Sequence, residues 1–273
     1  MGIEVNKKIK ISFIVFVILA NLFGCSTLTH LNVFPVSKDI ELGEQFDKEI
    51  RKSNKEYPIL NGHPEVKIYI ENIGKKILAS PDIRYKSQFA YKFEIINDDS
   101  TVNAFCTPGG YVYVYTGLLK FVDNEATLAG VIAHEIAHAE KRHSTNQITA
   151  QYGLQTAIEL ASGKIGESGT QVANIVAGLG MLKYSRTDED EADAYSFKYL
   201  QSTEYYPGAI SCFFEKIGLN RGGGSLERLL STHPLPQDRL NHLNELLAKA
   251  GNPQATESNL FVERYKKFRK ALP

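Results

Sequence analysis

Residues 134–138 read His-Glu-Ile-Ala-His. In a helix, two histidines four positions apart lie on one face, one turn apart. The imidazoles of His134 and His138 can therefore reach a single zinc ion at about 2.0–2.1 Å. Glu135 follows the first histidine and is placed to take a proton from a metal-bound water. The stretch predicts a catalytic zinc centre on a helix.

The residues around this stretch favour a metal over an ordinary helix. Val131, Ile132 and Ile136 make the helix apolar and therefore buried. A buried imidazole needs a polar partner, and a metal ion supplies one. The competing interpretation, two histidines in a helix without a metal, leaves that need unmet.

A catalytic zinc site also needs a third protein ligand and an open position for water. In the metzincin pattern the third ligand is a histidine six residues after the second one, where this chain has Ser144. The glycine of that pattern is replaced by Lys141, so the class is excluded. His143 is one residue out of register, and we expect it to lie at the surface or to support a ligand.

An acidic run on a second helix can supply the third ligand. Between Ser185 and Asp193, residues Glu189 and Asp193 are four apart and share a helix face. One can bind zinc while the other accepts the ring N–H of a ligating histidine. We favour Glu189 as the ligand and Asp193 as the support, while Glu191, rotated by about 200° from Glu189, faces away. Without the histidine helix, such a run is typical of a solvated face.

The chain as a whole predicts an α+β domain that is mainly helical, with a small antiparallel sheet beside the 134–138 helix. Alternation after Ala90 indicates a strand at 91–95, and further strands are expected at 101–105 and 111–115. Pro108-Gly109-Gly110 supplies the turn between the last two. Apolar residues at helical spacing predict helices near 37–50, 66–77, 124–139, 145–160, 170–200, 207–217 and 236–250.

Length and composition bound the function. The chain has 273 residues and 43% hydrophobic content, enough to bury a sizeable core. Lys plus Arg and Asp plus Glu each number 31, so no basic excess favours nucleic acid as a partner. Three cysteines are too few for a disulfide scaffold and lack the spacing of a zinc knuckle.

The first 24 residues predict a lipoprotein signal peptide. A basic start precedes an apolar run of about 13 residues, shorter than the ~20 of a membrane span. Leu22-Phe23-Gly24-Cys25 resembles a bacterial lipobox, so we expect cleavage before Cys25 and a lipid anchor on it; an uncleaved short anchor is the alternative. By analogy with the sorting of enteric lipoproteins, Ser26 after the cysteine, in place of Asp, favours the outer membrane, at its periplasmic face. The remaining chain divides into a tether at 25–36, a zinc peptidase domain at 37–250 and a C-terminal tail at 251–273.

Five segments in order resemble the HtpX-like and CAAX prenyl protease family of zinc metallopeptidases, in its soluble lipoprotein branch. These segments are Asn103-Ala104-Phe105 with Pro108-Gly109-Gly110, the strand at 111–116, the stretch at 134–138, Ser185-Arg186 leading into Glu189 and Asp193, and Ser231-Thr232-His233-Pro234 with Arg239. The match covers most of residues 37–245. The resemblance implies a zincin-like (gluzincin) fold.

The resemblance also implies a role for each site residue. His134, His138 and Glu189 are expected to bind one zinc ion, with Glu135 as the general base and Asp193 supporting a histidine. His233 and Arg239 are expected near the open side of the metal as donors to an oxyanion. In an outer-membrane member of the family the matching histidine instead sits on the zinc and holds the enzyme off, so two roles for His233 stay open.

The strand at 111–115 is similar to an edge strand that receives substrate, main chain to main chain. Its expected substrate-binding residues are Gly110, Tyr111, Val112 and Tyr113. Expected partners are unfolded or misassembled envelope proteins, and the membrane through Cys25. Cys106 and Cys212 can pair or stay as free thiols.

Together these patterns predict a zinc-dependent endopeptidase of the bacterial cell envelope that serves protein quality control. A zinc-bound lipoprotein chaperone or assembly factor with a latched site is the alternative. A cell-wall hydrolase with the same metal is a third reading, which the peptide-pairing strand disfavours.

Overall fold

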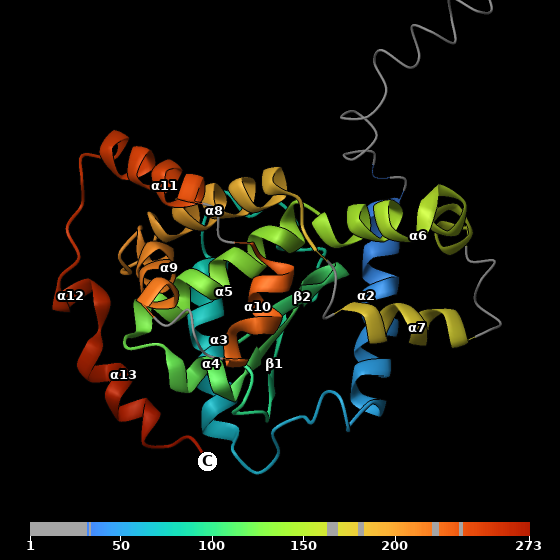
Figure 1. The fold of residues 1–273 in the computed structure, drawn as a ribbon, viewed down its shortest axis with the longest axis horizontal. Helices are drawn as coiled ribbons and strands as arrows, with labels where there is room; N and C mark the ends of the chain where they lie inside the picture. The colour runs from blue at the N-terminus through green and yellow to red at the C-terminus, as the bar shows by residue number, and fades with distance from the viewer. Residues whose placement is uncertain (1–31, 33, 163–168, 180–182, 220–223, 235–236) are drawn as a thin grey trace, which may run out of the picture.

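A computed structural model describes residues 32, 34–162, 169–179, 183–219, 224–234 and 237–273, and Figure 1 shows their arrangement. Helices dominate this part of the chain. The longer ones are α2 (Val36–Lys52), α3 (Pro64–Leu78), α5 (Glu125–Glu140), α6 (His143–Ala161), α7 (Gly169–Leu179), α8 (Arg186–Leu200), α9 (Ala209–Leu219) and α11 (Gln237–Lys249). The shorter ones are α4 (Thr116–Phe121), α10 (Glu227–Thr232), α12 (Glu257–Leu260), α13 (Val262–Arg269) and the 3-10 turns η2 (Pro108–Gly110) and η3 (Gly224–Leu226).

Helix α5 forms the centre of the fold. Every residue from Glu125 to Glu140 is buried, as expected for a helix that is apolar on all sides. Asn124 caps its start, because its side chain accepts a hydrogen bond from the Thr127 backbone N–H at 2.8 Å. The helix packs against α8 and α9 on one side and against β2 (Ala104–Thr107) and α3 on others. This confirms the mainly helical α+β prediction.

The three-stranded sheet beside α5 is mixed, so the prediction of an antiparallel sheet was wrong for one strand. Strand β3 (Tyr111–Tyr115) pairs antiparallel with β2 but parallel with β1 (Lys92–Ile96). The strand order is β1-β3-β2, which puts β3 in the middle. Residue alternation identifies a strand but not its direction, and only the β2–β3 hairpin has a turn short enough to force antiparallel pairing.

The hairpin between β2 and β3 depends on two glycines. Gly109 and Gly110 have φ values of 74° and 85°, in the left-handed region. A Cβ on Gly109 would lie 2.9 Å from the Asp39 backbone oxygen, and one on Gly110 would lie 2.9 Å from the Tyr91 ring. Both close approaches join the sheet to neighbouring segments, so the turn is held from two sides.

The sheet separates two hydrophobic cores. Val112 and Val114 of β3 face the larger core, which contains residues of α3, α5 and α9. Tyr113 and Tyr115 face the smaller core with residues of α2, α6 and α7. Because both faces are covered, the β3 strand is buried throughout, and Figure 1 shows α2 and α7 on the side of the sheet away from α9.

Two predicted segments contain more helices than expected. The expected helix near 170–200 is two helices, α7 and α8, and residues 180–182 between them lie outside the described residues. The expected polar tail at 251–273 contains α12 and α13, and α13 packs on the domain through buried Tyr265 and Phe268. The Phe268 ring stacks on Tyr69 with centroids 3.8 Å apart, which attaches the end of the chain to α3.

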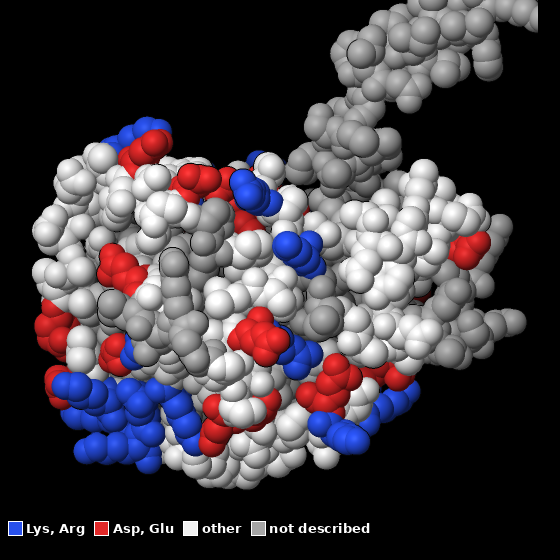
Figure 2. All heavy atoms as spheres, viewed as in Figure 1, with Lys and Arg blue, Asp and Glu red and all other residues white. Residues whose placement is uncertain are grey.

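The predicted signal peptide and Cys25 lie outside the described residues, as does most of the tether. Among the helices that are described, none has both the length and the apolar character that a membrane crossing requires. Acidic and basic side chains alternate over the face in Figure 2, apart from a basic cluster at the lower left, where Figure 1 places α13. Lys266, Lys267 and Arg269 lie in the last turn of that helix.

Candidate metal centre

Helices α5 and α8 bring the candidate ligands together. Ser185 starts α8 with a capping box, in which its hydroxyl accepts from the Asp188 N–H at 3.1 Å and the Asp188 carboxylate accepts from the Ser185 N–H at 3.1 Å. This places Glu189 in the first turn, facing α5. Farther along, the Ser196 hydroxyl donates to the Gly130 carbonyl at 3.0 Å and fixes the register of the two helices.

Four side chains converge at this contact. His134, His138, Glu189 and His233 each offer a ligand atom, and these atoms all lie within 4.8 Å of one another. The Nε2 atoms of His134 and His138 are 3.0 Å apart, and the Glu189 oxygens lie 3.6 and 3.4 Å from them. Ligands of a tetrahedral zinc ion are about 3.4 Å apart, so the donor set fits zinc.

The charge state of Glu189 also suits a metal ligand. Burial raises the pKa of this carboxyl, but His233 and Arg239 lower it by more, so it stays well below its usual range. The group is therefore an anion inside the core, and its oxygens face the two imidazoles. A cation among these donors balances that charge.

The outer nitrogens of both histidines are held in place. His134 Nδ1 lies 2.9 Å from Asp193 Oδ1, the arrangement expected of a supporting carboxylate. His138 Nδ1 lies 2.8 Å from His143 Nδ1. The Nε2 atoms of the two rings, 3.0 Å apart, face the centre of the cluster.

Glu135 lies beside the cluster and is almost completely buried. Its Oε2 atom accepts no hydrogen bond from the described part of the chain. Burial raises the pKa of the carboxyl, while His233 and His134 lower it in part and the Cys106 backbone N–H donates to it. A carboxylate with a raised pKa and a free oxygen has the properties of a general base.

His233 occupies the fourth corner of the cluster. It follows the last residue of α10, and its Nδ1 lies 2.9 Å from Glu189 Oε1. Its Nε2 lies 3.9 Å from Glu135 Oε1. The ring therefore offers a fourth possible ligand atom to the cluster, and it also contacts the group predicted to move protons.

Arg239 lies beside the cluster, at a hollow that His134, Glu135 and His233 also line, and its guanidinium is buried and paired. Nε and Nη2 both donate to Asp193 at 2.7 Å. Nη1 lies 2.6 Å from Glu189 Oε2 and also donates to the Pro234 carbonyl at 3.0 Å. These contacts hold the two carboxylates in place, so Arg239 positions the cluster and has little capacity left for an oxyanion.

Two buried side chains around His138 were missed or undervalued from the sequence. His143 was expected at the surface or behind a ligand, and the structure places it behind one, where its Nε2 meets Glu191 at 3.0 Å. Glu191 faces away from the cluster, as expected. The Tyr184 ring stacks on His138 with centroids 4.0 Å apart, and no spacing pattern identifies it beyond its place next to Ser185.

The predicted substrate strand was assigned the wrong position. Strand β3 is paired on both sides, so Gly110, Tyr111, Val112 and Tyr113 cannot receive an extended peptide at a free edge. The Tyr113 hydroxyl donates to Asp47 at 2.8 Å, on the α2 side of the sheet. A pattern of strong strand formers predicts a strand, and such strands are also the ones that fill a sheet centre.

Strand β2 is the edge that lies against α5. Within the described residues it pairs only with β3, and Cys106 in this strand contacts Glu135. The thiols of Cys106 and Cys212 are both free, so the two cysteines do not pair.

A buried helix with paired histidines, a glutamate on a second helix and a free carboxylate beside them defines a zinc metallopeptidase. This class also has the zincin-like arrangement of a sheet next to the active-site helix. The sequence model described as Peptidase family M48 matches residues 64–247. The chain belongs to peptidase family M48, a family of metalloproteases that use zinc.

Curated relatives agree with this assignment. The chain is 29% identical to the beta-barrel assembly-enhancing protease of Escherichia coli (strain K12) over 216 residues, 75% of this chain and 43% of the relative. It is 29% identical to the mitochondrial metalloendopeptidase OMA1 of Schizosaccharomyces pombe over 240 residues, 83% and 69% of the two chains. The metalloprotease YcaL of Escherichia coli (strain K12) is 31% identical over 153 residues, 55% and 59%. The chain thus spans less than half the length of the first relative.

Proposed function

We propose that this protein is a zinc-dependent endopeptidase of the bacterial cell envelope that hydrolyses unfolded or misassembled envelope proteins. The observation that carries the proposal is the buried carboxylate of Glu135, with one oxygen free, beside four converging ligand groups. The name of a relative, a protease that enhances β-barrel assembly, supports the envelope setting. Membership of peptidase family M48 supports the hydrolysis of peptide bonds.

In this proposal His134, His138 and Glu189 hold one zinc ion. When bound, zinc supplies a Lewis acid that polarises the peptide carbonyl and activates water. Glu135 accepts the proton of the attacking water through its free oxygen and returns it to the leaving amine. Asp193 and His143 keep the imidazoles oriented, and Arg239 keeps Glu189 and Asp193 in place.

The substrate chain is proposed to lie along β2 rather than β3. Strand β2 packs on α5, and a peptide that pairs with its main chain is recognised with little dependence on sequence. Such recognition suits unfolded polypeptides, which expose their main chain. Cys25 is proposed to carry a lipid anchor that keeps the enzyme at the periplasmic face of the outer membrane.

A cleavage assay tests the proposal. The full-length protein, loaded with zinc, is incubated with β-casein as an unfolded substrate, beside the Glu135→Gln variant and a chelated sample. We expect fragments from the zinc-loaded wild type alone. Equal cleavage by Glu135→Gln with zinc bound contradicts the assigned role of Glu135, and an intact substrate in every sample favours the latched site considered next.

A second function, a latched assembly factor, is favoured by the position of His233. Its ring completes a set of four protein ligands, and closed four-ligand sites are structural. His233→Ala separates the roles left open for this residue. A rise in casein cleavage identifies a latch, whereas a fall identifies an oxyanion donor.

A further inference from the structure

Helix α6 is apolar on its outer face as well as on its inner one. Ile148 and Leu160 on the inner face are buried in the smaller core. On the outer face Leu154 and Ile158, four residues apart and therefore one helical turn apart, are 47% and 46% exposed. In the described part of the chain one other large apolar side chain is exposed, Ile68 on α3. A helix that is apolar all round is typical of a protein interior or of lipid, so the outer face of α6 is suited to a partner outside the described residues.

Few charges interrupt this surface. Helices α6 and α7 have 19 and 11 residues, and Glu159 is the only Asp, Glu, Lys or Arg among them, whereas 23% of the whole chain is charged. The Glu159 carboxylate accepts a hydrogen bond from Gln155 at 2.7 Å. In Figure 2 the part of the face over α6 and α7 is accordingly almost all white. Apolar surface is favourably removed from water, so this face fits an apolar partner.

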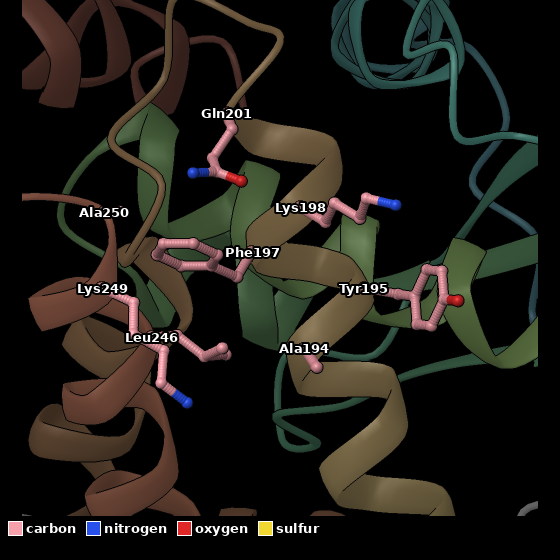
Figure 3. Close-up of a pocket in the computed structure, with 8 residues that line it drawn as sticks. All are labelled: Ala194, Tyr195, Phe197, Lys198, Gln201, Leu246, Lys249 and Ala250. Atoms are coloured by element: carbon pink, nitrogen blue, oxygen red, sulfur yellow. The ribbon is translucent and has the colours of Figure 1, made fainter.

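Two other surfaces of the described residues differ from this face in charge. A hollow of about 420 Å³ between α8 and the end of α11 has apolar side chains in its wall, but Lys198 and Lys249 line it as well (Figure 3). The basic cluster of α13, which includes Lys267, lies at the opposite end of the molecule from α6 (Figure 1). The hollow would carry charges into hydrocarbon, and the cluster would bind an anionic surface by charge rather than by insertion.

The chain that follows Cys25 reaches the fold at the start of α6. The Asn32 side chain donates to the Thr145 hydroxyl at 2.9 Å. Phe34 is buried in the smaller core, and its carbonyl accepts a hydrogen bond from Arg142. Cys25 is seven positions before Asn32, and an extended chain of that length spans at most about 25 Å. A lipid on Cys25 therefore keeps the start of α6 within about 25 Å of the bilayer surface.

We propose that the outer face of α6 lies on the lipid bilayer, with Leu154 and Ile158 inserted at the boundary between headgroups and acyl chains. This orientation rests on the lipid anchor of the proposed function. The anchor supplies the attachment and the apolar face supplies the orientation, since two membrane signals hold a protein more firmly than one. A bilayer is favoured over a protein partner because the anchor already keeps this face beside it.

This orientation brings the candidate metal centre close to the membrane. Helix α6 begins at His143, and the Nδ1 atom of His143 lies 2.8 Å from that of His138. Leu154 is eleven positions after His143, which corresponds to about 16 Å of helix. Polypeptides that stall at the bilayer surface are then the substrates nearest to the cluster.

Site-specific fluorescence tests which face meets the bilayer. The full-length protein is purified from membranes and reconstituted into vesicles of phosphatidylethanolamine and phosphatidylglycerol. In a Cys212→Ser background, which removes the less buried of the two free thiols, the dye NBD is attached at Leu154→Cys, Ile68→Cys or Lys267→Cys, and the background protein supplies the signal to subtract. Lipids with a doxyl group on the acyl chain should quench the label at 154 several-fold more than the other two, with blue-shifted emission. Ile68 is the matched control, as an exposed apolar residue on another helix, and Lys267 reports the basic cluster.

The outcomes separate the α6 face from the anchor. Flotation with the vesicles and the mass of the lipid on Cys25 report the anchor, while quenching reports the face. A protein that floats while the three labels are quenched equally, or while the label at 267 is quenched most, overturns the α6 face and leaves the anchor standing. Quenching at 154 without a lipid on Cys25 supports the face alone. A protein that neither floats nor shows quenching overturns both.

Added charge on the same face provides a second test. With NBD at Gln151→Cys, an exposed position on α6, the change Leu154→Glu/Ile158→Glu should lower the quenching to the level of the label at 68, because carboxylates resist transfer into hydrocarbon. Ile68→Glu is the matched control and should leave the quenching unchanged. Wild-type quenching in the double variant overturns the insertion of Leu154 and Ile158. Cleavage of β-casein in solution, which should be equal in all these variants, reports the peptidase separately.

Discussion

Two glutamates on α5, ten positions apart, have opposite environments. The carboxylate of Glu125 in the first turn accepts hydrogen bonds from Tyr205 at 2.6 Å, from Tyr69 at 2.5 Å and from Arg264 at 2.5 and 2.6 Å. Glu135 is equally buried, yet its Oε2 has no partner in the described part of the chain. Burial alone therefore does not distinguish the two residues.

The difference separates a structural charge from a chemical one. Glu125 lies at a helix N-terminus, where the helix dipole favours an anion, and its oxygens are fully used. A buried oxygen without a hydrogen bond costs about 1–3 kcal/mol. The unpaired oxygen of Glu135 keeps a proton acceptor available beside the ligand cluster. Buried polar atoms without a hydrogen bond are expected at functional sites.

Replacing Glu135 by Gln gives the largest expected effect. Cleavage of β-casein should fall about 10²–10⁴-fold, because an amide cannot accept the proton. The Tm should stay unchanged or rise, since the variant removes a buried charge with few partners. Initial rates, zinc content and thermal melts check this. A large fall in Tm would show that Glu135, like Glu125, stabilises the fold, and the difference between the two residues would be lost.

Arg239→Gln should lower stability by about 3–5 kcal/mol, the cost of leaving buried charges unpaired. Glu189 and Asp193 lose the guanidinium that holds them, so zinc affinity falls as well. Arg239→Lys keeps the positive charge but not the planar guanidinium that binds two carboxylates at once. It should therefore restore stability and zinc affinity only in part. Denaturant unfolding and zinc titration measure both effects. A variant with unchanged stability and zinc affinity but slower turnover would restore the oxyanion role predicted from the sequence.

Glu125→Gln should lower stability by about 1–3 kcal/mol, because Arg264 loses its carboxylate partner and two tyrosines lose a charged acceptor. The loss should lower the Tm by about 2–4 °C per kcal/mol. Activity per folded molecule should be unchanged, since no atom of Glu125 reaches the cluster. Melting curves and rates at 20 °C check this, and slower cleavage by fully folded protein would contradict it.

The sequence predicted the parts of the site that one helix carries. His134, Glu135 and His138 follow from spacing within a single element, and Glu189 with Asp193 follows from a shared face of a second helix. The contact of His233 with the cluster matches a resemblance rather than a pattern. Spacing could not show that the Arg239 guanidinium pairs with Glu189 and Asp193, because this contact depends on how α8 packs against α11.

The same limit explains the errors in the sheet. The run at 111–115 was correctly predicted to be a strand, but strand order depends on contacts between residues far apart in the chain. Strand β3 lies at the centre of the sheet, and β2 is the edge strand beside α5. Tyr184 was missed for the same reason, since its stacking on His138 joins two elements that no local signal relates.

His143→Gln tests whether this residue positions His138. The variant should bind zinc about 10–100-fold more weakly, as is typical when the outer partner of a ligating histidine is lost. The visible absorption of the cobalt-substituted protein should shift, because the imidazole changes orientation. His63→Gln, at a half-exposed histidine that contacts Glu65, is the control. Wild-type zinc affinity and spectrum in His143→Gln would leave His143 a merely structural residue.

Glu191→Gln gives the smallest expected effect, because this carboxylate is 42% exposed. A hydrogen bond from His143, against some burial and together with Lys141, lowers the pKa of Glu191 to about 2. The pKa is about 4.3 when unfolded, so the stabilising contribution is complete above that value and is lost as the pH falls through about 2. The variant should be less stable than the wild type by under about 1 kcal/mol at pH 6, with the difference vanishing toward pH 2. Denaturant unfolding across this range measures it, and a double-mutant cycle with His143→Gln isolates the pair. A difference that does not depend on pH would show that Glu191 acts by packing, and that the partner of His143 is not a charge.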